Sequence, residues 1–195
     1  GFTFTPASTA VTLTSNQSAN FTVASVRSYT FAGSVKTPKG QAIANAVLLI
    51  TAIDGTSRLV TTSRNGSFTA RSLPFGTLQV TAIARGYESR TLSIAHTRNS
   101  LKNVLTLSPL PFTLSGVVRN TRGEALRGAT IKISGIGTAT TLATGSDGRF
   151  SINVPHGTTA KVSVSKSGCR MTPGTATTKI DGANKALTAF VASCR

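Results

Sequence analysis

Apolar and polar residues alternate along most of this chain with a period of two. The clearest examples are residues 78–83 (LQVTAI) and 161–165 (KVSVS), and residues 46–53 (AVLLITAI) form a longer run of β-favouring residues. A period of two places successive side chains on opposite faces of a strand, and Gly, Pro, Asn and Asp bound these runs at short intervals. The pattern predicts antiparallel strands and an all-β fold without an amphipathic helix.

The whole pattern is written twice. Gly33 recurs as Gly116, 83 positions later, and Phe68 recurs as Phe150. Repetition at a fixed period indicates repeated structural units. We therefore predict two tandem β-sandwich repeats of about seven short strands each, at residues 27–109 and 110–195. Residues 1–26 resemble the tail of a third copy, because residues 1–6 (GFTFTP) match residues 168–173 (GCRMTP).

Two short dipeptides mark matching turns in the repeats. Asn65-Gly66 and Asp147-Gly148 each separate two strand-like segments. Such pairs tolerate positive φ at both central positions of a tight turn, which predicts β-hairpins. A calcium loop around Asp147 is the alternative, but the first repeat has Asn65 at that position and no other acidic residues cluster nearby.

The first 26 residues carry no charge and have strand-like alternation of apolar residues. The alternating positions are Phe2, Phe4, Val11, Leu13, Phe21 and Val23. Apolar strands with open edges need to be covered. The segment could belong to a preceding domain, fold onto the first repeat, or complete a neighbouring subunit as an intersubunit strand. In the third case these six residues form an intersubunit packing surface.

Positive charge dominates the composition. Lys and Arg total 21 against 5 acidic residues, which gives a formal net charge of +16 spread over both repeats. Such a field favours acidic partners such as an anionic polysaccharide or a cell surface, although it could also serve solubility alone. Nucleic acid is a less favoured partner, because the chain has no Trp and only Tyr29 and Tyr87, and base stacking requires exposed aromatic residues.

The two cysteines, Cys169 and Cys194, have no accompanying metal-binding pattern. They could be free thiols, intermolecular links or a disulfide. A disulfide is favoured, because it would tie the end of the last strand to the loop after Gly168, and it implies an oxidising compartment. No apolar stretch is long enough to span a membrane. The chain begins at Gly1, which favours a processed piece of a longer precursor.

The sequence indicates no catalytic, cofactor-binding or metal-ligating residues, and we expect no enzyme activity. The five acidic residues are scattered, and no Gly-rich phosphate-binding loop is present. A metal site usually needs three or four converging ligands. His156 stands alone in a turn where the first repeat has Phe75, so we expect it to be a surface residue.

Several motifs together carry a family resemblance. In the first repeat they are Gly33-Ser34-Val35, Gly40, Ala46, Asn65-Gly66-Ser67-Phe68, Leu73-Pro74-Phe75-Gly76 and Gly86-Tyr87. In the second they are Gly116-Val117-Val118, Gly123, Ala129, Asp147-Gly148-Arg149-Phe150, Val154-Pro155-His156-Gly157 and Gly168-Cys169. This set resembles the carboxypeptidase regulatory-like domain, a transthyretin-like, seven-stranded Greek-key sandwich close to the Cna-B modules. The resemblance implies non-catalytic domains of the kind found in stalks, adhesin repeats and accessory domains.

Some Cna-B modules form a Lys–Asn/Asp isopeptide bond with the help of a buried acid. The strand that carries this acid in the family corresponds here to residues 80–83 and 162–165, and neither segment contains one. We therefore expect that Lys36 forms no isopeptide bond.

Two functional classes follow. The first is a structural subunit or spacer of an extracellular fibre, filament or adhesin stalk, with copies of itself or adjacent repeats as partners. The style of the modules favours a bacterial source. The second is a cell-surface binding module for an acidic glycan or a protein. The two differ in salt dependence, because electrostatic binding weakens with ionic strength and apolar assembly does not.

Overall fold

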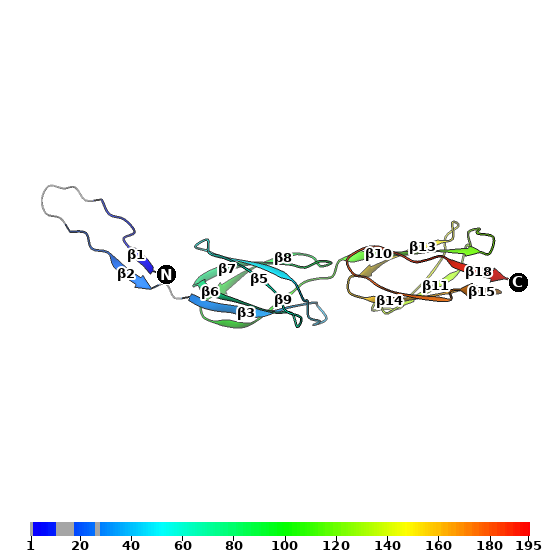
Figure 1. Ribbon diagram of the computed structural model, residues 1–195, viewed down its shortest axis with the longest axis horizontal. Helices are drawn as coiled ribbons and strands as arrows, with labels where there is room; N and C mark the ends of the chain where they lie inside the picture. The colour runs from blue at the N-terminus through cyan, green and yellow to red at the C-terminus, as the bar shows by residue number, and fades with distance from the viewer. Residues whose placement is uncertain (1, 11–17, 26–27) are drawn as a thin grey trace. The chain divides into compact units, whose positions relative to one another are not determined.

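The computed structural model describes residues 2–10, 18–25 and 28–195, and the regular elements among them are β-strands (Figure 1). This part of the chain contains no helix that could cross a membrane. The chain divides into two compact units, Gly1–Ala84 with Ser89–Leu107, and Arg85–Glu88 with Ser108–Arg195. Each unit contains one β-sandwich, which confirms the predicted fold class.

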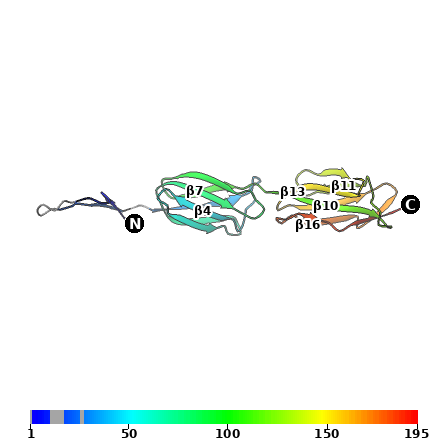
Figure 2. The same cartoon turned by 90° about the horizontal axis from the view of Figure 1, so that it is seen from above.

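The first sandwich consists of a three-stranded and a four-stranded sheet (Figure 2). Its strands are β3 (Ser28–Lys36), β4 (Val47–Ala52), β5 (Ser57–Thr61), β6 (Ser67–Pro74), β7 (Gly76–Ile83), β8 (Arg90–His96) and β9 (Ser100–Thr106). The sheet orders are β6-β3-β9 and β5-β4-β7-β8.

The second sandwich repeats this arrangement with two additional short strands. Its strands are β10 (Pro111–Asn120), β11 (Thr130–Ser134), β12 (Thr140–Ala143), β13 (Arg149–Pro155), β14 (Thr159–Ser165), β15 (Cys169–Thr172), β16 (Thr175–Lys179), β17 (Lys185–Ala186) and β18 (Phe190–Cys194). The sheet orders are β13-β10-β18-β15, with β17 beside β10, and β12-β11-β14-β16.

The first and last strands of each sandwich run parallel, which corrects the prediction of antiparallel pairing. Val35 of β3 lies opposite Leu105 of β9, and Val118 of β10 lies opposite Phe190 of β18. The other pairs between strands are antiparallel, apart from the short β10–β17 contact. Alternation has the same period in either direction, so it predicts a strand but leaves its direction open.

The alternating pattern buries one face of each strand. On β4, Leu48 and Ile50 are fully buried, whereas Val47 and Leu49 on the other face are exposed. The largest core side chains of the two sandwiches are Phe31, Leu73, Leu78, Leu105, Leu107, Leu114, Ile131, Ile133, Ile180 and Phe190. Burying a side chain of this size contributes roughly 1.5–3 kcal/mol, so these layers supply most of the driving force for folding.

The structure has tight turns at Asn65-Gly66 and Asp147-Gly148, but neither turn is a β-hairpin. Only the glycines have positive φ, +76° at Gly66 and +72° at Gly148. The first turn joins β5 to β6 and the second joins β12 to β13, and in both cases the two strands belong to different sheets. The prediction of turns at these positions was correct, but the prediction that the two flanking strands pair with each other was wrong. Packing in the core, and not the turn, decides which sheet receives the next strand.

Each of these turns lies against the first strand of its sandwich. The carbonyl of Gly66 accepts a hydrogen bond from the amide of Val35 at 2.8 Å, and Gly148 accepts one from Val118 at 2.8 Å. A Cβ added to Gly66 would lie 2.6 Å from the carbonyl oxygen of Val35, which is closer than a side chain can approach. Glycine is therefore required here both by the positive φ and by the close backbone contact.

The N-terminal segment forms a strand pair of its own, β1 (Phe2–Thr5) and β2 (Thr22–Ser25), visible as a two-stranded ribbon in Figure 1. The strands are antiparallel, with Phe4 opposite Val23. Val11 and Leu13, which belong to the predicted packing surface, lie outside the described residues.

Candidate functional site

Acidic groups, which cation sites and most acid–base catalysis require, are few and scattered. Two of the five make ion pairs: Asp147 with Arg149 at 3.8 Å, and Asp181 with Lys185 at 2.9 Å. Among the described residues, no group of three or more His, Cys, Asp or Glu residues could hold a metal ion. The Asp147 turn in particular has no second acid beside it, so its carboxylate serves the turn, where it accepts a hydrogen bond from the amide of Arg149.

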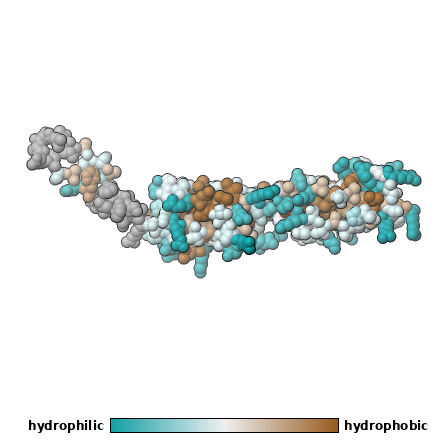
Figure 3. All heavy atoms as spheres, in the orientation of Figure 1, coloured by the Kyte–Doolittle hydropathy of each residue, from teal (hydrophilic) through white to brown (hydrophobic). Residues whose placement is uncertain are grey.

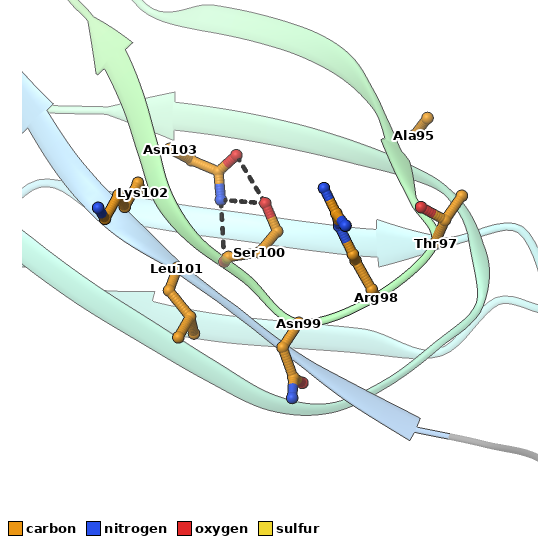
Figure 4. A pocket seen from close by; sticks show the side chains of 8 residues that line it. All are labelled: Ala95, Thr97, Arg98, Asn99, Ser100, Leu101, Lys102 and Asn103. Carbon is orange, nitrogen blue, oxygen red and sulfur yellow. Dashed lines mark hydrogen bonds between the residues drawn. The ribbon is translucent and has the colours of Figure 1, made fainter.

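A shallow polar depression of about 690 Å³ lies along residues 95–103, between β8 and β9. Figure 4 shows Ser100 and Asn103 facing each other, with Arg98 beside them. The Asn103 amide donates to the carbonyls of Ala32 at 2.8 Å and Ser100 at 3.0 Å, so its role is to fix the irregular start of β9. Arg98 and Lys102 give the depression positive charge, and its lining contains no nucleophile paired with a base.

His96, at the end of β8, is a fully buried residue that the sequence analysis did not single out. Neither ring nitrogen has a hydrogen-bond partner among the described residues. The imidazole makes edge contacts with Tyr29 and Phe31, with ring centroids 5.9 Å apart in both cases. Burial lowers the pKa of His96, and the backbone of Tyr29 opposes this shift. The matching registers of the two sandwiches make Ile180 the equivalent residue.

His156 is half-buried, which corrects the prediction that it is a surface residue. Its ring packs edge-on against Tyr87 at 4.9 Å and Phe112 at 6.2 Å, within the second unit. Burial lowers the pKa of His156, and the carboxylate of Asp181 opposes this shift. The sequence did contain a signal for the partial burial of His156, because the equivalent position of the first repeat holds an aromatic residue, Phe75.

Cys169 and Cys194 are joined by a disulfide. They lie directly opposite each other on the antiparallel strands β15 and β18. The equivalent pair in the first sequence repeat is a bridge between Tyr87 and Pro109. The disulfide thus replaces a non-covalent contact at a position that the repeat already brings together.

The β1–β2 pair has the same register as the last antiparallel strand pair of the second sandwich. Phe2 lies opposite Ser25, as Cys169 lies opposite Cys194. This register makes Phe21, which precedes β2, the equivalent of Phe190, which precedes the same stretch of β18.

The position of Phe21 is a core position in both complete sandwiches. Its equivalents are Leu105 and Phe190, which are 1% and 0% exposed. Phe21 itself is 44% exposed. A residue type and register suited to a core are therefore present in a segment that has no sandwich around it among the described residues.

A further set of exposed apolar residues escaped the sequence analysis. Val47, Leu49, Leu59 and Ile83 lie on the outer face of the four-stranded sheet of the first sandwich. The signal was present in residues 46–53, where apolar residues run continuously instead of alternating. A continuous run indicates a strand that is apolar on both faces.

Comparison with solved structures finds a similar fold in one bacterial protein and a weaker likeness to two pilins. The TIE protein of Bacillus anthracis aligns with 88% of this chain and 36% of its own length, at 15% identity and a TM-score of 0.57. A streptococcal ancillary pilin aligns over 86% of this chain and 62% of its own length (15% identity, TM-score 0.39). A variant of the shaft pilin SpaA from Lactobacillus rhamnosus GG aligns over 87% and 98% (13% identity, TM-score 0.39). The chain thus spans about a third of the TIE protein, and at these identities the likeness concerns the fold alone.

No curated protein matches the chain. A family model, by contrast, matches most of it, at residues 30–107 and again at residues 113–190. These two segments coincide with the two sandwiches and contain the glycine turns described above. The chain belongs to the carboxypeptidase regulatory-like domain family, of which it contains two tandem copies.

Proposed function

We propose that this chain is a non-catalytic structural subunit or spacer of an extracellular fibre, filament or adhesin stalk, assembled through β-strand packing. The observation that carries the proposal is the register of β1 and β2, which reproduces the last antiparallel strand pair of the second sandwich. This register supports the interpretation of residues 1–26 as part of a further copy of the unit. Serial copies of a sandwich without catalytic groups suit a role in spacing and building.

The exposed Phe21 supports assembly through the N-terminal segment. A two-stranded ribbon by itself is marginally stable in water. The residues equivalent to Phe21 are buried by the other strands of a sandwich, so β1 and β2 require strands from elsewhere to cover them. Those strands come from a preceding repeat or from a neighbouring copy, and both sources place sandwiches in series.

The disulfide supports an extracellular location. Such bonds persist in oxidising environments and are rare in the cytosol. The Cys169–Cys194 bond closes the last strand of the second sandwich against β15. A protein exposed to proteases outside the cell gains from that closure.

Removal of residues 1–25 tests the proposal. The strands in this segment pair with each other and with no other strand, so the shortened chain keeps both sandwiches. We expect the full chain, whose monomer mass is 20.1 kDa, to form species larger than a dimer in light scattering and negative-stain microscopy, and the shortened chain to lose these larger species. Phe21→Ser should act like the deletion, and Asn20→Ser, at the neighbouring exposed position, should not. An unchanged mass distribution after the deletion would contradict assembly through this segment.

A second candidate is binding of an acidic glycan, which the depression at residues 95–103 favours through Arg98 and Lys102. Heparin serves as the probe. Binding through these cations should weaken steeply between low and high NaCl and should fall in Arg98→Ala more than in a control such as Lys39→Ala. Binding that is equally strong at both salt concentrations would contradict this function.

A further inference from the structure

The outer face of the four-stranded sheet in the first sandwich carries an exposed apolar patch. The patch consists of Val47, Leu49, Leu59 and Ile83, which are 37%, 44%, 69% and 54% exposed. Leu49 lies opposite Leu59 on β5, and Val47 lies opposite Ile83 on β7, so the four side chains form one group across three strands. In Figure 3, brown atoms gather on the first sandwich over the region of β5, β7 and β8.

The second sandwich shows that the fold does not require this patch. The equivalent positions, from the matching repeat and registers, are Thr130, Lys132, Thr141 and Ser165. Lys161 and Lys179 lie on the same outer face. One copy of the unit therefore presents an uncharged face with an apolar patch among threonine, serine and glutamine side chains, and the other presents a polar face with three lysines. Because the two copies share their architecture, the fold itself does not account for this difference.

Charge is absent from the patch and its surroundings on the face. The ionisable residues of β4, β5, β7 and β8 are Arg58, Arg90 and the buried His96. Arg58 lies opposite Ile50 and Arg90 opposite Ala82, two core residues, so neither arginine belongs to the outer set of residues. On a chain of net charge +16, this uncharged sheet face is a specific local feature, and exposed apolar patches of this kind mark interaction sites.

We infer that this face packs against the same face of a second copy of the chain, sheet on sheet about a two-fold axis. The inference rests on the proposed function, which requires copies to associate, and it names a lateral surface for doing so. The lysine-bearing face of the second sandwich is a poor occupant, because Lys132, Lys161 and Lys179 would lose their hydration against apolar side chains. An identical face brings no charge into the contact and can align its strands as packed sheets do.

The size of the face sets the strength of this contact. Four strands about 4.8 Å apart and about five residues of 3.4 Å long give a projected area of roughly 330 Å². A stable interface buries about 800 Å² on each partner. The contact between two chains is therefore weak and reversible, and it becomes persistent where many copies lie in register along an assembly.

Salt distinguishes this contact from the binding of an acidic partner. The two copies carry the same net charge of +16, so added salt screens their repulsion and strengthens the apolar contact. An acidic protein or glycan bound to this face would instead be released by salt. A rise in association with NaCl supports the second copy as occupant, and a fall overturns it.

Sedimentation velocity over a range of protein and NaCl concentrations tests the inference. The variant Val47→Thr/Leu49→Lys/Leu59→Thr/Ile83→Ser transfers the polar residues of the second sandwich to the first, so the fold should accept it. The parent and the variant are both measured in chains without residues 1–25, so that assembly through β1 and β2 does not contribute. We expect the shortened parent to shift from its monomer mass towards twice that mass as protein and salt increase, and the shortened variant to lose this shift. Equal association of chain and variant, or a chain that stays monomeric throughout, overturns the inference.

Cysteine crosslinking provides the matched control. A two-fold axis through the centre of the patch brings Leu49 of one copy near Leu49 of the other, so Leu49→Cys should form disulfide-linked dimers under mild oxidation. Lys132→Cys, at the equivalent position of the second sandwich, should not. Equal crosslinking at both positions overturns the inference. Loss of residues 1–25 tests assembly through β1 and β2 and leaves this face intact, so the two failures can be told apart.

Discussion

The buried His96 makes the stability of the first sandwich depend on pH. Its side chain is fully buried and its two ring nitrogens have no partner among the described residues, and burial lowers its pKa. Above the unfolded pKa of about 6.5, the imidazole is neutral in both states and its contribution to stability is fully present. As pH falls below that value, the His96 imidazole is protonated in the unfolded chain but stays neutral in the folded chain. The sandwich is therefore destabilised progressively until the pH reaches the lowered pKa of the folded state.

The size of this effect follows from linkage. One group that binds a proton only in the unfolded state changes the free energy of unfolding by at most about 1.4 kcal/mol for each pH unit. His96→Ile removes the dependence, and Ile180 shows that the same core position accepts isoleucine. The replacement also removes a buried imidazole whose polar contact with the backbone of Tyr29 falls short of a well-formed hydrogen bond, so the variant should also be more stable than the parent at pH 8.

Urea unfolding followed by circular dichroism between pH 5 and 8 measures this directly. We expect the transition of the first sandwich to move to lower urea as pH falls, and to stay in place in His96→Ile. His156→Phe, which inserts the residue type of Phe75, is the control and should alter only the second transition. If the first transition is as stable at pH 5 as at pH 8, or if His96→Ile loses stability with pH as the parent does, the reasoning from burial is wrong.

Three further predictions concern the disulfide, the glycine turns and Lys36. Replacement of Cys169 and Cys194 by serine should destabilise the second sandwich by about 3 kcal/mol, because the bond closes a loop with a sequence separation of 25; chemical unfolding of both forms checks this, and an unchanged midpoint would contradict it. Gly66→Ala should cost more stability than Gly40→Ala, since both have positive φ but only Gly66 lies against a carbonyl of β3, and equal losses in thermal unfolding would refute the role of that contact. The mass of the intact protein should show no loss of ammonia or water, and such a loss would reveal an isopeptide bond at Lys36.

The sequence predicted the features that depend on local pattern. Alternation and the 83-residue repeat identified the strands and the two sandwiches. Strand direction and sheet membership depend on contacts between distant residues, so the parallel β3–β9 pair and the cross-sheet turns were not predicted. His96 follows Leu92 and Ile94 at alternate positions of one strand. This alternation indicates the same face of the strand for all three residues, but the polarity of histidine argued against burial.

The candidate site was predicted less well than the fold. Phe21 was recognised as a strand residue that needs cover, but its equivalence to Leu105 and Phe190 required the registers of three strand pairs. The part of the apolar patch that lies on β4 belongs to residues 46–53. The sequence analysis used that apolar run only as evidence for a strand. Which face of that run is the inner one depends on the neighbouring strands, and a single sequence does not supply them.

The parallel pairing of first and last strands has a mechanical consequence for each sandwich. When the two ends of one domain are pulled apart, β3 and β9 slide along each other, because the chain enters at the start of one and leaves at the far end of the other. In this shear geometry the hydrogen bonds of the ladder share the load and must rupture together, whereas an antiparallel pair of terminal strands would open one bond at a time. In the second sandwich the load reaches β10 and β18, and the disulfide anchors β18 to β15 near the point where force enters. A domain with parallel terminal strands should therefore need a higher pulling force to unfold than a domain of the same size whose terminal strands are antiparallel.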